Sequence, residues 1–491
     1  MIPMPAWTDD PRSPARDSVR RLARATGLAA ILWGAGMALA WAVGIEPIYG
    51  HPAPFYALWW PVGIRGMLVA LVIFGAWSVV AILARRAVPP VVPRNASPPW
   101  KGLAAVTLLF IGFALLTASI RGVSGAWQAY TRETYEVIGD IGKASSIPAF
   151  FRRYNEIHPW LSMHGKVHPP GPAALLWLFS HGTGRSAPAL ALATLGFGAL
   201  AIPLAWLWIR RATNAPVARA AALLIGCVPS VVLFGAVSAD FLFLPITLAT
   251  LWLFHEALYR RGHPLWSVAA GVGYACMALM KYSLPAVGAW FAVVGLLMLR
   301  RPGGWRVVAR TALLMAVASG GVLLLVWGLT GFNYLEGFAR AAAQFRLDQR
   351  HLDRLAPRYP GWTFRVCFNP LAFFYFAGFP VSLLTLACWI RLLRQARRAA
   401  RSASPRRLMA LTCGETALAC LVTACVLNLL YLARGEGERS ALYLFPFLVL
   451  PAAWILAATR YRARSDAPLA TAMLLMAAQA ILTEGLFYTY W

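Results

Sequence analysis

Long apolar stretches recur from one end of this sequence to the other. Stretches of about 18 to 25 residues are long enough to cross the hydrocarbon core of a bilayer, roughly 30 Å thick, as helices. Of the 491 residues, 59% are hydrophobic, whereas soluble domains are about 45–50% apolar. A transmembrane β-barrel needs segments of alternating polarity, which are lacking here. We therefore predict an all-α fold, a polytopic transmembrane helical bundle.

About thirteen segments are expected to span the membrane. They are residues 26–44, 65–84, 102–120, 186–209, 215–236, 241–259, 265–280, 283–299, 311–330, 370–390, 408–432, 440–459 and 467–488. Lys and Arg are enriched in cytoplasmic loops. With a cytoplasmic N-terminus, the basic clusters near residues 20, 85, 210, 260, 300, 391 and 460 all lie inside, and the C-terminus lies outside.

The net charge of +27 follows from the same clusters. A strongly basic chain can bind nucleic acid, but in a membrane protein the positive-inside rule accounts for the excess. We expect no nucleic-acid partner. The seven cysteines show no CxxC pair and no spacing suited to zinc, and we interpret them as small buried residues.

One apolar run is too short to cross the bilayer. It covers residues 172–182 and follows the sequence MHGKVHPPGP. Eleven helical residues extend only about 17 Å. The prolines at 169, 170 and 172 stiffen its start. We predict a juxtamembrane helix on the extracytoplasmic side, because a crossing here would also reverse the orientation of the next basic cluster.

Two long loops, 121–170 and 331–369, are expected on the extracytoplasmic side although both are rich in Lys and Arg. Cations there need another explanation than the positive-inside rule. They bind a phosphate or anionic lipid headgroups, or they are merely solvated. Residues 339–362 have apolar residues spaced for one face of a helix and arginines on the other faces. This pattern predicts an amphipathic helix on the membrane surface.

The first long loop contains four acids, Glu133, Glu136, Asp140 and Glu156. A carboxylate held near the membrane surface can act as a general base or bind a divalent metal. A solvated loop acid is the simpler explanation for any one of them, and the sequence leaves both open.

Two ionisable residues lie at the outer ends of predicted spans. Asp240, in VSADFLFLP, is either functional or the N-cap of the following helix. Lys281, in MALMKYSLP, either extends to the headgroups or binds an anion.

Two further motifs lie on the same side. His164, Lys166 and His168 precede the prolines. The two histidines favour hydrogen bonds to a phosphate or sugar hydroxyl over zinc, since no third ligand is evident. A turn in ARGEGERS (433–440) contains Glu436 and Arg439, which suit recognition of a phosphate headgroup or form a self-contained ion-pair turn.

The predicted membrane topology places all of these candidates on the extracytoplasmic face. Glu415 differs from them, since it is an acid within a predicted span near the cytoplasm. Convergence from distant parts of the chain indicates an outer-side active site with an opening to the lipid.

The stretches YEVIGDIGKASSIPAFFRRY, LSMHGKVHPPGP and GEGERSALYLFPF, with VSADFLFLP and MALMKYSLP, resemble the GT-C-type membrane glycosyltransferases. These enzymes use polyprenyl-phosphate-linked sugars, and they include protein mannosyltransferases and aminoarabinose transferases. They have a catalytic acid in the first large outer loop, followed after about thirty residues by a Pro-Pro or Lys-Pro motif. The motif resemblance covers only about 80 residues.

The resemblance implies an integral membrane glycosyltransferase of the bacterial inner membrane that inverts the sugar. It suggests Asp140 as the general base, since Asp140 precedes His168-Pro169-Pro170 by 28 residues, with Glu133 and Glu136 as alternatives. Substrate contacts then fall to His164, Lys166, His168, Asp240, Lys281, Glu436 and Arg439. The usual Asp-Glu dipeptide after the first span is missing, which leaves the choice of acid open.

The same resemblance divides the chain into four parts. Residues 1–101 form a tail and two accessory spans, 102–330 a catalytic core, 331–369 an interfacial segment, and 370–491 the C-terminal spans. The implied partners are a polyprenyl-phosphate-linked sugar, membrane lipids and an acceptor that is a lipid, a glycan or a protein. No cofactor is expected, although a divalent metal stays open.

Two other functions use the same residues without chemistry. A transporter or flippase for a lipid-linked anion would need the outer-face cations and broken helices at mid-membrane. The sequence shows no repeat symmetry of that kind. A non-catalytic membrane scaffold would not explain the gathering of ionisable residues on one face.

Overall fold

The structure, a computed structural model, describes residues 15–43, 58–89, 97–355, 361–399, 413–431 and 437–489. Regular structure in these ranges is almost entirely helical, which confirms the predicted all-α class. The sole strand pairing there joins β1 (Leu58–Trp59) to β2 (Phe487–Tyr488) in antiparallel register. This short ladder ties the start of α2 to the end of the last helix.

Every predicted span contains a helix. Among the described residues, eight helical segments are long and apolar enough to cross a membrane, and two bent helix pairs raise that number to ten. The other three predicted spans coincide with shorter apolar helices. The protein is thus a multi-pass membrane protein, while thirteen as the number of crossings stays a prediction.

The helices of the first half of the chain are α1 (Ala15–Ala42), α2 (Ile64–Ala87), α3 (Trp100–Ala118), α4 (Ile147–Ile157), α5 (Gly171–Thr183), α6 (Ala187–Ala199), α7 (Ala201–Ala212), α8 (Ala215–Ile225), α9 (Pro229–Val237) and α10 (Phe243–Tyr259). Those of the second half are α11 (Pro264–Met280), α12 (Gly288–Leu299), α13 (Gly304–Thr330), α14 (Tyr334–Leu355), α15 (Gly361–Thr363), α16 (Asn369–Phe376), α17 (Phe379–Ala399), α18 (Cys413–Leu430), α19 (Gly437–Ser440), α20 (Phe445–Ala463) and α21 (Ala467–Leu486).

Two predicted spans are sharply bent. Helices α8 and α9 meet at 53°, and the segment Gly361–Phe376 meets α17 at 116°. Proline begins α9, where its missing N–H costs no helical hydrogen bond. Gly378 at the second bend has a φ of +90°, which a residue with a Cβ rarely adopts. Turn chemistry therefore explains both breaks.

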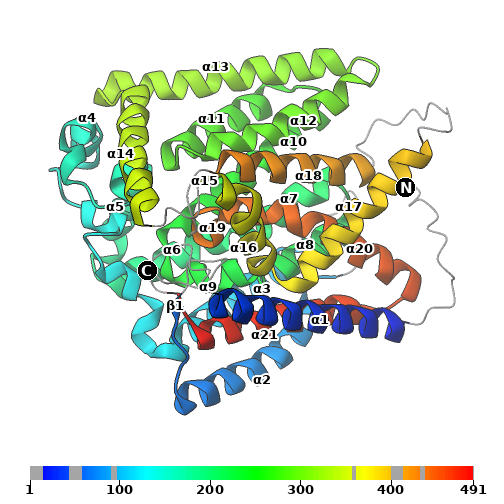
Figure 1. Ribbon diagram of the computed structural model, residues 1–491. Helices are drawn as coiled ribbons and strands as arrows, with labels where there is room; N and C mark the ends of the chain where they lie inside the picture. The colour runs from blue at the N-terminus through cyan, green and yellow to red at the C-terminus, as the bar shows by residue number, and fades with distance from the viewer. Residues whose placement is uncertain are drawn as a thin grey trace.

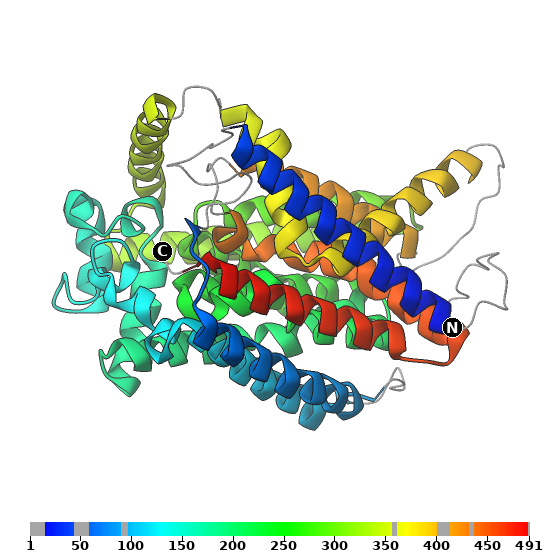
Figure 2. The ribbon, with the colours of Figure 1, turned by 60° about the horizontal axis from the view of Figure 1, so that its bottom comes forward.

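The long helices run side by side along one direction, and α14 runs across one end of the bundle (Figure 1). The first helix begins at the opposite end of the bundle from the end of α21 (Figures 1 and 2). This arrangement agrees with the expected placement of the two termini on opposite sides.

At the end of the bundle remote from α14, arginines of the basic clusters form ion pairs with acidic side chains. Arg211 binds Glu256 in a bidentate pair at 2.8 and 2.5 Å, at the C-terminal end of α10. Glu415, the unexplained acid, lies in the first turn of α18 and pairs with Arg301 at 3.2 Å. Its presence within a predicted span is thus accounted for by a local ion pair.

The predicted surface helix at 339–362 is α14, which begins earlier, at Tyr334, and ends at Leu355. Gly337 and Ala341 face inward and are buried, whereas Arg346 and Arg350 are exposed. The helix packs on α4 and on the 3-10 turn η6 (Gly165–Val167). It therefore covers the segment that precedes the prolines.

Helix α5 is the short helix predicted at 172–182. Its 13 residues extend about 20 Å. A Cβ on its first residue, Gly171, would lie only 2.2 Å from the carbonyl oxygen of Leu279, near the end of α11. The absence of a side chain at Gly171 thus lets the proline corner approach the backbone that leads into Lys281.

Gly171→Ala tests this close approach. We expect the added methyl group to force the two backbones apart and to cost about 1–3 kcal/mol of stability, the usual penalty of overpacking. Gly182→Ala is the matched control, since Gly182 lies in the same helix with open space around it. Thermal unfolding of the purified protein in detergent should show a lower Tm for Gly171→Ala only. Equal Tm values would contradict the close approach.

Candidate active site

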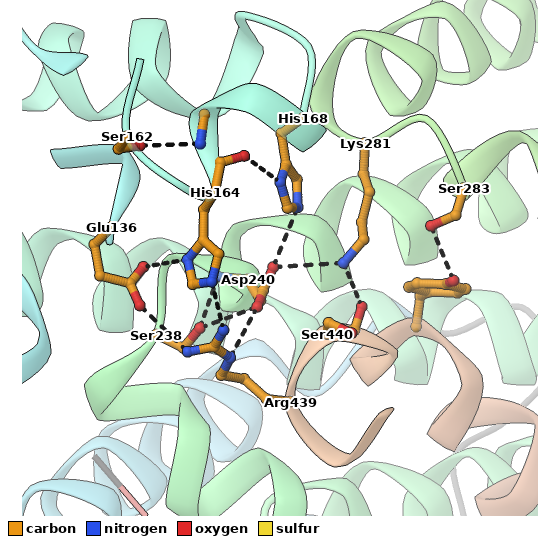
Figure 3. Close-up of polar contacts among 12 residues, drawn as sticks. Glu136, Ser162, His164, His168, Ser238, Asp240, Lys281, Ser283, Arg439 and Ser440 are labelled. Atoms are coloured by element: carbon orange, nitrogen blue, oxygen red, sulfur yellow. Dashed lines mark hydrogen bonds and ion pairs between the residues drawn. The ribbon is translucent and has the colours of Figure 1, made fainter. Parts of the chain in front are cut away.

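Six side chains from distant parts of the chain meet at the end of the bundle covered by α14, and we call them the central cluster (Figure 3). They are Glu136, His164, His168, Asp240, Lys281 and Arg439. All were predicted as site residues from the sequence. The structure joins them into one network of contacts.

Backbone pairing explains why the first loop contributes two of the six. The amides of Met163 and His164 donate to the carbonyls of Thr134 and Tyr135, both at 3.0 Å. These bonds place the segment before the prolines alongside the segment that contains Glu136.

Arg439, in α19, bridges both acids of the cluster. It donates to Glu136 Oε1 at 3.2 Å, and its Nε lies 3.5 Å from Asp240 Oδ2. It also donates to His164 Nε2 at 3.0 Å, so this nitrogen must present its lone pair. The proton of His164 is then on Nδ1, which lies 3.2 Å from Glu136 Oε2. Burial alone would raise the pKa of Glu136, but His164 and Arg439 outweigh it and lower that pKa.

Asp240, in the 3-10 turn η7 (Ala239–Leu242), is surrounded at longer distances. Lys281 Nζ lies 3.6 Å and His168 Nε2 3.7 Å from Oδ1, and the Ser238 hydroxyl donates to Oδ2 at 3.3 Å. The predicted N-cap role falls to Ser238, whose hydroxyl accepts from the amide of Asp240. The carboxylate of Asp240 is therefore contacted mainly by charged and ionisable side chains.

Lys281 follows the last residue of α11 and points into the cluster. Its ammonium donates to the carbonyl oxygen of Ser440 at 2.8 Å and lies 5.2 Å from the ring centroid of Phe243. Of the two roles left open for Lys281, the structure shows an inward-facing cation and not one extended to the surface.

The central cluster is enclosed. Asp240, Lys281 and His168 are each 8% exposed, and Arg439 is 2% exposed. The space beside Glu136, lined by Ala239 and neighbouring apolar residues, is too narrow for a water molecule. The space beside Glu136 is thus not the lipid-accessible hollow expected from the sequence.

Asp140, the preferred base from the sequence, has partners of its own. Its carboxylate accepts hydrogen bonds from the amide and hydroxyl of Ser162, both at 2.7 Å, and from Lys143, also at 2.7 Å. The Ser162 hydroxyl in turn accepts from the amide of Gly165 at 2.9 Å. Asp140, 1% exposed, therefore fixes the turn that precedes His164 and His168.

The remaining predicted residues lie apart. Glu133 is exposed, as is the loop acid Glu156, which pairs with Arg153. Lys166, in η6, is partly buried. Glu436 lies outside the described residues.

The zinc alternative has no support in the geometry of the histidines. The rings of His164 and His168 lie 6.3 Å apart, and both ring nitrogens of His164 already have partners. No group of three or more His, Cys, Asp or Glu side chains is arranged for a metal ion in the part of the chain that the structure describes.

Two structural partners were not predicted from the sequence. Ser162 anchors Asp140, and Tyr154 donates from its hydroxyl to the carbonyl of Gly165 at 2.6 Å and also contacts that of His168. Neither has a sequence signal beyond its residue type, because the partners are set by the fold of the loop.

Comparison with protein families matches residues 167–329 to the family described as dolichyl-phosphate-mannose-protein mannosyltransferase. The matched third of the chain includes His168, Asp240 and Lys281. This match confirms the resemblance to GT-C-type glycosyltransferases. A comparison with curated proteins gave no match.

Solved structures with a similar arrangement include an Archaeoglobus fulgidus oligosaccharyltransferase in complex with Zn and sulfate, with 16% identity, a TM-score of 0.45, and coverage of 77% of this chain and 53% of that chain. The present chain thus spans about half the length of that protein. Cupriavidus metallidurans ArnT in the apo state matches with 15% identity, a TM-score of 0.44 and 78% of each chain. ArnT bound to undecaprenyl phosphate matches with 15% identity, a TM-score of 0.40 and 77% of each chain.

Asp140→Asn should destabilise the protein. An amide offers one acceptor oxygen where the carboxylate offers two, and its NH₂ group would face a donor. Leaving buried donors unsatisfied costs about 1–3 kcal/mol. We expect a lower Tm in detergent for Asp140→Asn. Ser162→Ala should lower the Tm as well, but by less. An unchanged Tm with loss of activity would instead indicate that Asp140 acts on the substrate.

Proposed function

We propose that this protein is a membrane glycosyltransferase that transfers a sugar from a polyprenyl-phosphate donor to an acceptor hydroxyl. The observation that carries the proposal is the central cluster, in which a buried lysine and a buried arginine converge on Asp240 beside two histidines. The family match over 167–329 supports the same class. Buried ionisable residues gathered at one place are typical of a functional site.

The leaving group of such a reaction is a lipid phosphate, and it gains negative charge as the bond to the sugar breaks. Lys281 and Arg439 are the cations of the central cluster that can stabilise this charge. Because both are buried, their effect on the charge is much stronger than in water. Their present neutralisation by Asp240 and Glu136 keeps them in position without substrate.

The acceptor hydroxyl attacks the anomeric carbon from the side opposite the phosphate, and a single displacement inverts that carbon. We assign Asp140 to positioning the loop, since its carboxylate already accepts three hydrogen bonds from Ser162 and Lys143. The enclosed cluster must open before a lipid-linked sugar can bind.

We place the reaction on the extracytoplasmic side of the bacterial inner membrane. Basic clusters such as Arg211 with Glu256 mark the end of the bundle remote from the central cluster. Under the positive-inside rule, that end is cytoplasmic. Lipids on the outer leaflet would then supply the donor by lateral diffusion.

A transporter for a lipid-linked anion is the second candidate. The two bent helix pairs favour it, because broken helices are typical of transporters. Purified protein in liposomes, supplied with a panel of radiolabelled polyprenyl-phosphate sugars and cell-envelope extract, distinguishes the two. Glycosyltransfer predicts label in a new, covalently glycosylated product. Label that changes leaflet and stays on the polyprenyl phosphate would contradict the proposal.

Lys281→Gln should reduce transfer severely, because removal of one preorganised donor to a developing oxyanion costs about 10²–10³ in kcat. Lys101→Gln, a change of the same type at an exposed position at the start of α3, is the control and should leave the rate unchanged. Initial rates in the liposome assay provide the measurement. Equal rates for the two variants would remove Lys281 from the mechanism.

A further inference from the structure

The ring of His168 is held in one tautomer. Its Nδ1 lies 2.8 Å from the carbonyl oxygen of His164, and a carbonyl oxygen can only accept a hydrogen bond. The proton of the neutral ring is therefore on Nδ1. Its Nε2 then has a lone pair and no hydrogen, so it can accept a hydrogen bond but not donate one.

No hydrogen-bond partner for Nε2 of His168 is present among the described residues, although the residue is only 8% exposed. The nitrogen points towards Asp240 Oδ1 at 3.7 Å, beyond hydrogen-bond distance (Figure 3). The ring stacks on Phe243 with centroids 5.7 Å apart. A buried, oriented nitrogen without a partner is costly unless a ligand completes it.

The surroundings keep His168 neutral. Burial lowers its pKa, and the neighbouring ammonium of Lys281 acts in the same direction, against the opposite effect of Asp240. Burial and the adjacent cation therefore favour the neutral imidazole, and the hydrogen bond from Nδ1 to the carbonyl of His164 leaves its lone pair on Nε2.

We propose that His168 binds the acceptor hydroxyl and takes its proton, and that it is not a ligand of the donor phosphate. A lone pair repels a phosphate oxygen but accepts a hydrogen bond from an alcohol. This assignment rests on the proposed glycosyltransfer. It identifies the acceptor group as a neutral hydroxyl, carried by a sugar, a lipid or a protein side chain.

The step is balanced with the groups at hand. The proton of the hydroxyl moves to Nε2 of His168 while its oxygen forms a bond to the anomeric carbon. The bond between that carbon and the phosphate oxygen breaks, and its electron pair stays on the lipid phosphate beside Lys281. The resulting imidazolium lies next to the carboxylate of Asp240, which stabilises it.

The first test separates phosphate from hydroxyl recognition. Binding of undecaprenyl phosphate to the purified full-length protein in detergent is measured for the unaltered protein, His168→Gln, His168→Lys and Lys281→Gln. We expect Lys281→Gln to weaken binding at least tenfold and His168→Gln to change it less than twofold. A tenfold loss in His168→Gln would overturn the proposal, because it would make His168 a phosphate ligand.

The second test measures turnover with the labelled donor that is active in the liposome assay. His168→Gln retains an acceptor oxygen but cannot take a proton, so we expect kcat to fall at least 100-fold with little change in the donor KM. His168→Lys should be equally inactive although it supplies a cation. Activity in His168→Lys near that of the unaltered protein would overturn the assignment.

A third measurement does not depend on any substrate. The ¹⁵N NMR signals of labelled imidazoles, assigned by their disappearance in His168→Gln, should show a protonated Nδ1 and an unprotonated Nε2 at neutral pH. The opposite tautomer or an imidazolium would overturn the assignment of His168 alone. Absence of both binding and transfer in the unaltered protein would instead overturn the proposed glycosyltransfer.

Discussion

The buried guanidinium of Arg439 is the contact on which the site depends. It joins α19 to Glu136 in the first outer loop and to Asp240 in η7, the turn that precedes α10. Breaking a buried ion pair by removing one partner costs about 3–5 kcal/mol, since the other charge is left uncompensated. The loop, the span and the C-terminal turn are therefore held together by the same charges that are proposed to act on the substrate.

Much of this arrangement could be predicted from the sequence, for a physical reason. Hydropathy and basic clusters orient the spans, and that orientation alone brought Asp240, Lys281 and the histidines to one face. The partner of Asp140 could not be predicted in this way. Spacing to the prolines favoured Asp140 as the base, a role that stays a prediction. Its hydrogen bonds to Ser162 span 22 residues that include α4, and such a contact leaves no periodic signal in the sequence.

The enclosed state of the cluster directs attention to α14. This helix packs on η6, and Gly337 within it approaches Tyr282, the residue after Lys281, so closely that a Cβ there would lie 2.6 Å from the Tyr282 hydroxyl. Tyr334 and Phe338 of α14 also contact the ring of Tyr282. The second long loop thus covers the first, and it does so through contacts with the residue next to Lys281.

Groups of two kinds lie around Asp240 within a few ångströms. Lys281 and Arg439 offer positive charge and N–H donors, which suit a phosphate. His168, which lies near the same carboxylate oxygen as Lys281, offers a lone pair, which suits a hydroxyl. The carboxylate is attracted to both cations at rest and to an imidazolium once a proton has moved. In the proposed transfer, the same acid would hold the central cluster together and stabilise the charge that transfer creates. Such a double role would account for a costly buried charge at this position.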